Sequence, residues 1–217
     1  MYPFNPQPIV PKEVLQRIMA TAKMPNCQVY LNIGTIKTGS TFLQKEVFPK
    51  LTGIKYLHHP SLTDAVFCLF LYKKLLLSDE RYSGVYEAFL PIEARKYMME
   101  QLHKLYPLAK IIITLRTNEE EFVESNYNQC VHEKPLNRNH FKGTFKEFQA
   151  LYNPNWNNHY MIEQELREYW DEVLILSYHE LCTEPTLYVT KICQFMEVAV
   201  PKFKNIRHNI RKIPKKR

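Results

Sequence analysis

Short runs of consecutive apolar residues alternate along the chain with segments in which apolar residues recur at helical spacing. The continuous runs are Gln28–Ile33, Lys74–Ser78, Lys110–Leu115 and Glu172–Ser177. The helical spacing occupies Pro11–Lys23, Phe42–Val47, Ile92–Leu105, Tyr160–Trp170 and Pro185–Met196. Continuous apolar runs predict strands that are buried on both faces. Because helices separate these strands, the sequence predicts an α/β protein, a three-layer sandwich with a mainly parallel central sheet.

The composition is typical of one folded globular domain. The chain has 217 residues, of which 45% are hydrophobic and only 5 are Gly, and we predict a single domain over 1–217. Within it, residues 1–27 form a helical lead-in, Asn137–Asn158 forms a long loop or cap, and 201–217 form a basic tail. No apolar run reaches the length of a membrane span, and the first residues lack the features of a secretory signal. We therefore expect a cytoplasmic protein.

The positive charge of the chain is concentrated at its C-terminal end. The net charge is +7, but eight basic residues and no acidic ones lie in 201–217. The 21 other Lys and Arg residues almost balance the 22 acidic residues. A basic tail on a neutral body argues against a nucleic-acid partner. The five cysteines include no C-x-x-C pair, so we predict neither a disulfide framework nor a metal site.

A glycine-containing loop follows the first predicted strand and precedes a helix. Its pattern is Gly34-x-x-Lys37-x-Gly39-Ser40-Thr41. Backbone N–H groups at a helix start, two hydroxyls and an ammonium can converge there on one phosphate-like anion. A nucleotide kinase or GTPase would need its lysine directly after the second glycine, whereas Lys37 precedes Gly39. An ordinary strand-to-helix turn with a solvated lysine is the alternative.

Three segments resemble the sulfotransferase family, whose members use 3′-phosphoadenosine 5′-phosphosulfate (PAPS). Asn32–Gln44 resembles the family's 5′-phosphosulfate loop, and Lys110–Arg116 with Ser125 resembles its 3′-phosphate site. Val173–Leu181 with Ile192–Met196 is similar to its late strand and helix. The resemblance covers about residues 28–200. It implies a P-loop-like sulfotransferase fold and transfer of a sulfuryl group from PAPS to a hydroxyl of a carbohydrate or small metabolite, which leaves 3′-phosphoadenosine 5′-phosphate (PAP).

The resemblance also implies roles at the nucleotide. Lys37 would stabilise the charge on the leaving oxygen. The residues that would hold the 5′-phosphate are Thr38, Gly39, Ser40 and Thr41. Arg116 would bind the 3′-phosphate with bidentate hydrogen bonds from its planar guanidinium group. A salt bridge to Glu119 or Glu120 is the alternative.

Ser125 would complete the 3′-phosphate site. It stands one position later than the family's usual spacing, at which Glu124 stands here. A longer loop can absorb this difference, because Asn118 can cap a helix whose first turn holds three glutamates.

The acceptor side needs a general base at the end of a strand. Asp79 and Glu80 follow the second predicted strand, and this position resembles the acidic site of carbohydrate-directed family members. We predict Glu80 as the base, with a surface turn as the alternative. His58 and His59 are the second choice, since cytosolic phenol and steroid sulfotransferases use a histidine.

Two outlying segments could complete the site. Family members often close over the nucleotide with a basic segment near this position. In the basic tail of this chain, the residues that would do so are Arg207, Arg211 and Lys212. A solvated tail is the alternative. Trp156 and Tyr160 could flank an acceptor.

Two other functions stay open at this point. One is a kinase-like phosphotransferase on the same sheet topology. The other is a non-enzymatic protein that binds anionic polysaccharide or nucleic acid through its tail. The oligomeric state is not predicted.

Overall fold

The computed structural model describes residues 26–34, 38–79, 92–116, 118–132, 141–151 and 159–204. Within them a five-stranded, entirely parallel sheet has the order β2-β3-β1-β4-β5. The strands are β1 (Gln28–Gly34), β2 (Lys55–His58), β3 (Lys74–Ser78), β4 (Lys110–Leu115) and β5 (Val173–Ser177). The predicted parallel sheet is thus confirmed, and all its carboxyl ends lie at one edge.

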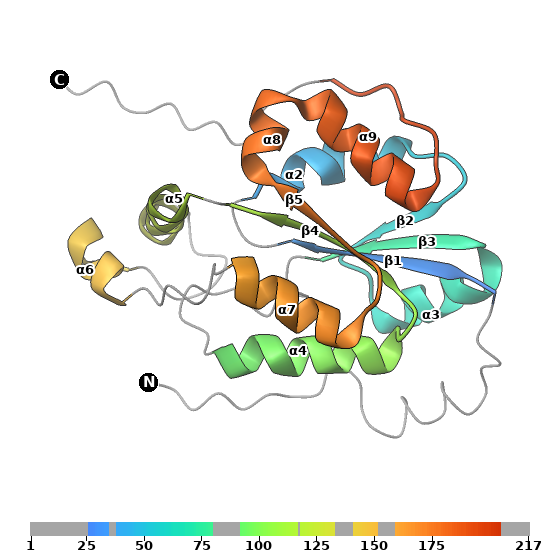
Figure 1. The fold of residues 1–217 in the computed structure, drawn as a ribbon, viewed down its shortest axis with the longest axis horizontal. Coiled ribbons are helices and arrows are strands. Elements are labelled where there is room, and N and C mark those ends of the chain that lie inside the picture. The colour runs from blue at the N-terminus through green and yellow to red at the C-terminus, as the bar shows by residue number, and fades with distance from the viewer. Residues whose placement is uncertain are drawn as a thin grey trace.

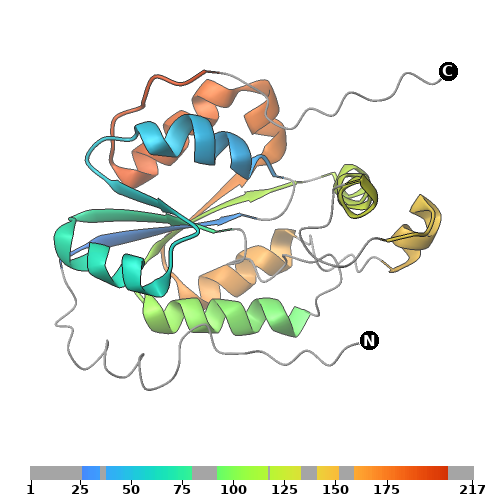
Figure 2. The ribbon, with the colours of Figure 1, turned by 180° about the vertical axis from the view of Figure 1, so that it is seen from behind.

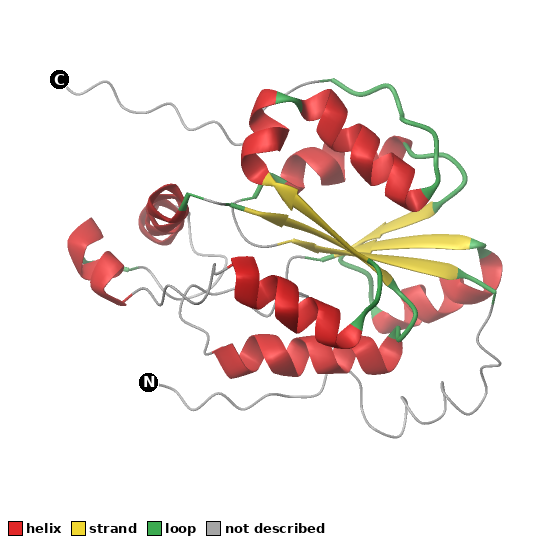
Figure 3. Cartoon of the chain, in the orientation of Figure 1, coloured by secondary structure: helices red, strands yellow, loops and turns green. Residues whose placement is uncertain are grey.

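Helices cover both faces of this sheet (Figure 1, Figure 3). One layer holds the continuous helical segment α2 (Ser40–Phe42), η1 (Leu43–Val47) and η2 (Phe48–Lys50), together with α8 (Tyr178–Thr183) and α9 (Pro185–Met196). The other layer holds α3 (Leu62–Leu71), α4 (Ile92–Leu105) and α7 (His159–Tyr169). Beyond the carboxyl ends of the strands lie α5 (Glu119–His132) and α6 (Phe145–Leu151), as both views show (Figure 2).

Two hydrophobic clusters hold the layers together, one on each face of the sheet. Because successive side chains of a strand point to opposite faces, Tyr30 packs into the cluster of α9, whereas Leu31 packs into that of α4 and α7. All strand residues from Leu75 to Leu77 are fully buried. Burial on both faces explains why the central strands are continuous apolar runs, and it leaves the carboxyl edge as the place for polar chemistry.

Several elements depart from the prediction. The sequence did not indicate β2, α3 or α8. The predicted loop Asn137–Asn158 contains α6, so that prediction was wrong over Phe145–Leu151. A capping box explains this helix: the Thr144 hydroxyl accepts from the Glu147 N–H at 3.3 Å, and the Glu147 carboxylate accepts from the Thr144 N–H at 2.6 Å. The hydrogen bonds that the carboxylate accepts from the Thr144 N–H and from the Thr144 hydroxyl lower the pKa of Glu147.

Some predictions fall outside the described residues. These are the helix Pro11–Lys23, nearly all of the 1–27 lead-in and residues 205–217 of the basic tail. The single domain over 1–217 therefore stays a prediction. In the part of the chain that the structure describes, no helix combines the length and apolarity that a membrane crossing requires.

Candidate functional site

The loop after β1 enters the helical segment at the carboxyl edge of the sheet. Lys37 lies outside the described residues, whereas Thr38 and Ser40 are buried and Thr41 is half-buried. α2 begins at Ser40. The first N–H groups of a helix have no partner within the helix, so this end is suited to an anion.

Gly39 is required by the geometry of this loop. Its φ of 80° is in the left-handed region, and a side chain there would overlap Leu181 Cδ2 and lie 3.4 Å from the Tyr178 ring. Both neighbours belong to α8, which directly follows β5. The loop is therefore held between its own helix and α8, and only glycine fits.

Arg116 follows β4 and lies against the same tyrosine. Its guanidinium carbon is 4.3 Å from the centroid of the Tyr178 ring, which is a cation–π contact. Arg116 Nε is 3.6 Å from Glu121 Oε2, and Nη1 donates to the Glu121 carbonyl oxygen at 3.4 Å. Among the described residues, Arg116 thus forms an ion pair with Glu121, which the sequence analysis did not name as its partner. Through Tyr178, the structure brings Arg116 and Gly39 to one site.

The end of β4 that carries Arg116 is fixed from α9. The hydroxyls of Thr114 and Tyr188 form a buried hydrogen bond. Burial raises the pKa of Tyr188, so the phenol stays neutral and keeps this bond at physiological pH. The position at which β4 ends is therefore set by the core.

Ser125 lies on α5. It is one helical turn after Glu121, so the two side chains share a face. Ser125 is half-buried, whereas Glu124 is exposed. The Glu121 N–H donates to Asn118 Oδ1 at 3.1 Å, so the predicted cap at Asn118 is confirmed.

The acceptor side is described at Asp79, whereas Glu80 lies outside the described residues. The Asp79 side chain is only 1% exposed, and its Oδ1 is 3.0 Å from His59 Nδ1. His59 follows β2 with a φ of 47°, a conformation that costs a non-glycine residue about 1–2 kcal/mol. His58 is exposed, and its ring centroid is 3.9 Å from that of His59. The sequence analysis named His59 and Asp79 but did not predict that they pair.

The comparison with known protein families bears on the half of the chain that contains Arg116. The sulfotransferase family matches residues 91–202, which is more than half of the chain. The chain belongs to the sulfotransferase family.

Solved sulfotransferases share the fold of this family member. A sulfotransferase from Alicyclobacillus acidocaldarius has a TM-score of 0.58 and 18% identity, over 83% of this chain and 85% of that one. The mouse sulfotransferase SULT7A1, complexed with PAP, has a TM-score of 0.52 and 18% identity, over 88% of this chain and 65% of that one. At this identity the likeness concerns the fold.

One curated sequence relative has a different name. VraA of Staphylococcus epidermidis, which carries the name of a long chain fatty acid-CoA ligase, is 26% identical over 103 residues. The match covers 46% of this sulfotransferase-family chain and 23% of VraA. The chain therefore spans less than a quarter of the length of that relative.

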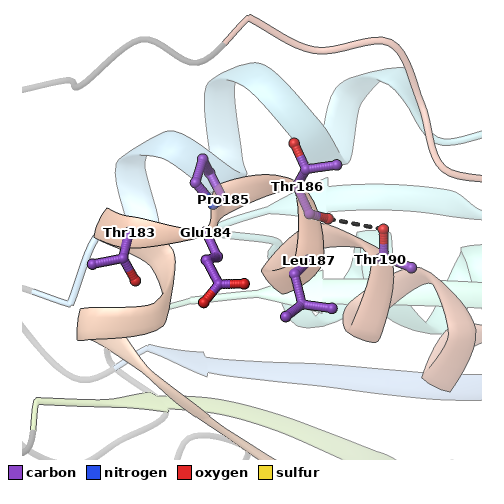
Figure 4. A pocket seen from close by; sticks show the side chains of 6 residues that line it. All are labelled: Thr183, Glu184, Pro185, Thr186, Leu187 and Thr190. Atoms are coloured by element: carbon purple, nitrogen blue, oxygen red, sulfur yellow. Dashed lines mark hydrogen bonds between the residues drawn. The ribbon is translucent and has the colours of Figure 1, made fainter.

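A shallow pocket lies at the junction of α8 and α9 (Figure 4). Its lining consists of Thr183, Glu184, Pro185, Thr186, Leu187 and Thr190. This lining offers one carboxylate and three hydroxyls but no cation. Two of the hydroxyls are engaged, because Thr183 donates to the His179 carbonyl at 3.0 Å and Thr190 donates to the Thr186 carbonyl at 2.8 Å. The pocket is therefore poorly suited to the phosphates of a nucleotide.

The remaining candidate residues are not described at the level of side chains. Trp156, Arg207, Arg211 and Lys212 lie outside the described residues, and Tyr160 belongs to α7 without a described side chain. Tyr178 is the main residue that the sequence analysis missed. It directly follows β5, so the rule that ligands lie beyond strand ends would have included it.

Proposed function

We propose that this sulfotransferase-family protein transfers a sulfuryl group from PAPS to a hydroxyl of a carbohydrate or small metabolite. The observation that supports this most directly is the position of the Tyr178 ring, whose edge lies 3.4 Å from the place of a Cβ at Gly39 and whose centroid lies 4.3 Å from the Arg116 guanidinium carbon. A loop suited to one anion and a guanidinium suited to another are adjacent at the carboxyl edge of the sheet. PAPS carries two separate phosphate groups, so it matches two adjacent anion sites.

The nucleotide would be held mainly by the loop and by Arg116. The 5′-phosphosulfate would accept hydrogen bonds from the residues Thr38, Gly39, Ser40 and Thr41. The 3′-phosphate would accept from Arg116 and Ser125. Arg116 is already beside Glu121, so we expect the phosphate to replace this carboxylate as its partner, which favours a doubly charged ligand. In the tail, Arg207, Arg211 and Lys212 would add positive charge to the nucleotide site.

The reaction would depend on positioning and electrostatics. The bond between sulfur and the bridging oxygen breaks while the acceptor oxygen forms a new bond to sulfur. Lys37 would stabilise the negative charge that the bridging oxygen gains as PAP leaves. Glu80, which follows Asp79 in the chain, would take the proton from the acceptor hydroxyl.

The test is stabilisation by nucleotides, measured as the melting temperature with PAP, with ADP and with ATP plus Mg²⁺. A ligand at 100 times its dissociation constant adds about 2.7 kcal/mol to the free energy of unfolding. We expect PAP to stabilise most, because it alone carries a 3′-phosphate for Arg116. The Arg116→Ala variant is the matched control and should respond much less to PAP.

Two outcomes would overturn the proposal. Stabilisation by ATP with Mg²⁺ and none by PAP would favour a kinase-like phosphotransferase. Binding of anionic polysaccharide that is lost with the tail and falls steeply with salt, without any response to nucleotides, would favour the non-enzymatic function.

A further inference from the structure

His59 is fixed to the end of β3 by two contacts. Its backbone N–H donates to the Ser78 carbonyl oxygen at 3.0 Å, and its side-chain Nδ1 is 3.0 Å from Asp79 Oδ1. The first contact continues the pairing of β2 with β3 by one residue beyond His58↔Ser78. The second joins the side chains that follow these two strands.

Burial and backbone conformation indicate which partner is the anchor. The Asp79 side chain is 1% exposed, whereas that of His59 is 41% exposed. His59 also adopts a φ of 47°, and a histidine keeps such a conformation only where its surroundings determine it. A buried carboxylate needs a hydrogen-bond donor. The Nδ1 atom of His59 lies within hydrogen-bond distance of Asp79, although the backbone of His59 is strained.

Ser78 connects this pair to the phosphate loop. The Ser78 hydroxyl accepts from Asn32 Nδ2 at 2.9 Å and from Gln44 Nε2 at 3.4 Å. Asn32 is on β1, and Gln44 is in η1, the helical segment that continues from the loop. The chain at Ser78–Asp79 is therefore held on one side by β1 and η1, the elements that flank the loop, and on the other side by His59.

We propose that His59 is a positioning residue of the acceptor side: its Nδ1–H donates to Asp79 and fixes the chain at the end of β3. This inference rests on the proposed function, because the acceptor side has a role only if an acceptor binds. Asp79 is too deeply buried to contact an acceptor itself. His59 acts through the position of its neighbours, and its imidazole takes no part in the proton transfer.

Substitutions at His59 separate positioning from direct proton transfer. The amide nitrogen of asparagine can occupy the place of Nδ1 and donate to Asp79, and asparagine tolerates positive φ. We expect His59→Ala to lower kcat for sulfate transfer from PAPS by about 10–100-fold, with little change in the affinity for PAP. His59→Asn should keep most of the wild-type kcat, whereas His59→Gln, whose amide extends past the Nδ1 position, should resemble His59→Ala.

A matched control isolates the effect of alanine at positive φ. Glu197 has a φ of 54° and lies at the opposite edge of the sheet, near Lys74 and Lys110. Glu197→Ala should leave kcat near its wild-type value. If His59→Asn loses as much kcat as His59→Ala, the imidazole itself takes the proton and the proposal is wrong. If His59→Ala keeps the wild-type kcat, His59 has no role.

A second measurement does not depend on activity. In ¹⁵N-histidine NMR at a pH where imidazoles are neutral, His59 should carry its proton on Nδ1, with the signal assigned by its loss in His59→Asn. A proton on Nε2 would contradict the proposal even if activity changed. Absence of sulfate transfer by the wild-type protein, with the Nδ1–H tautomer present, would instead count against the proposed function alone.

Discussion

The loop at Gly39 and the side chain of Arg116 lie next to the same tyrosine, Tyr178, but are built in different ways. The loop offers backbone groups whose position is set by buried residues and by the tight contact of Gly39 with α8. Arg116 is a side chain at a strand end that already has an anionic neighbour, Glu121. The proposed 5′-phosphate site is thus part of the fold, whereas the proposed 3′-phosphate site would exchange one partner for another. Changes at the loop should affect folding and binding together, whereas changes at Arg116 should affect binding alone.

The largest effect is expected for Gly39→Ala. The new Cβ would be strained by about 1–2 kcal/mol at positive φ, and its overlap with Leu181 would add about 1–3 kcal/mol. The free energy of unfolding, measured with urea, should fall by both amounts, and PAP binding should be lost. Gly53→Ala is the matched control, because Gly53 has a φ of 77° with no atom within 4 Å of a Cβ. Equal losses in the two variants would show that α8 does not constrain the loop.

Arg116→Ala should weaken PAP binding by about 1.5–3 kcal/mol, the range for a hydrogen bond to a charged group. Titration calorimetry with PAP and with adenosine 5′-phosphosulfate, which lacks the 3′-phosphate, measures the difference. The second nucleotide should bind almost as well as to the wild-type protein, and the melting temperature without ligand should change little. An equal loss for both nucleotides would assign Arg116 to another role.

Tyr178→Leu should weaken PAP binding by a smaller amount, about 0.5–2 kcal/mol for the lost cation–π contact. Tyr178→Phe keeps the aromatic ring and should bind PAP like the wild-type protein. In Arg116→Ala, the change at Tyr178 should have little further effect on PAP binding, because the two side chains act as a pair. If the losses of PAP affinity in the two variants are additive, Tyr178 and Arg116 contribute to PAP binding independently.

The smallest effect is expected for Ser125→Ala, about 0.5–1.5 kcal/mol of PAP affinity from one hydrogen bond. Glu124→Ala is the control one position earlier. Since Glu124 is exposed, this change should not reduce the affinity for PAP. A greater loss at Glu124 would show that α5 presents the other face to the nucleotide.

The sequence predicted the elements whose pattern is strong. The bounds Ile92–Leu105, Pro185–Met196 and Lys110–Leu115 agree with α4, α9 and β4. The strand β2 was missed because it is a short edge strand with half-buried residues, so it has no continuous apolar run. The helix α8 was missed because it follows β5 with no turn residue between them.

The parts of the site that were missed depend on pairing between distant segments. His59 meets Asp79 only because β2 and β3, which α3 connects along the chain, pair side by side in the sheet. Arg116 meets Glu121, and neither of the glutamates named beforehand, because the cap at Asn118 sets the direction in which α5 leaves the sheet. Residue types after a strand can be found in a sequence, whereas their partners depend on strand order and helix phase.

The central claim, sulfuryl transfer from PAPS, is tested most directly by following labelled sulfate from PAPS to a panel of hydroxyl compounds with the wild-type protein and with Lys37→Ala. The account predicts transfer to at least one acceptor by the wild-type protein. It also predicts that Lys37→Ala lowers turnover by more than it weakens PAP binding, because the charge that Lys37 stabilises appears mainly in the transition state. Turnover by Lys37→Ala at the wild-type rate, or no transfer by a wild-type protein that binds PAP, would contradict it.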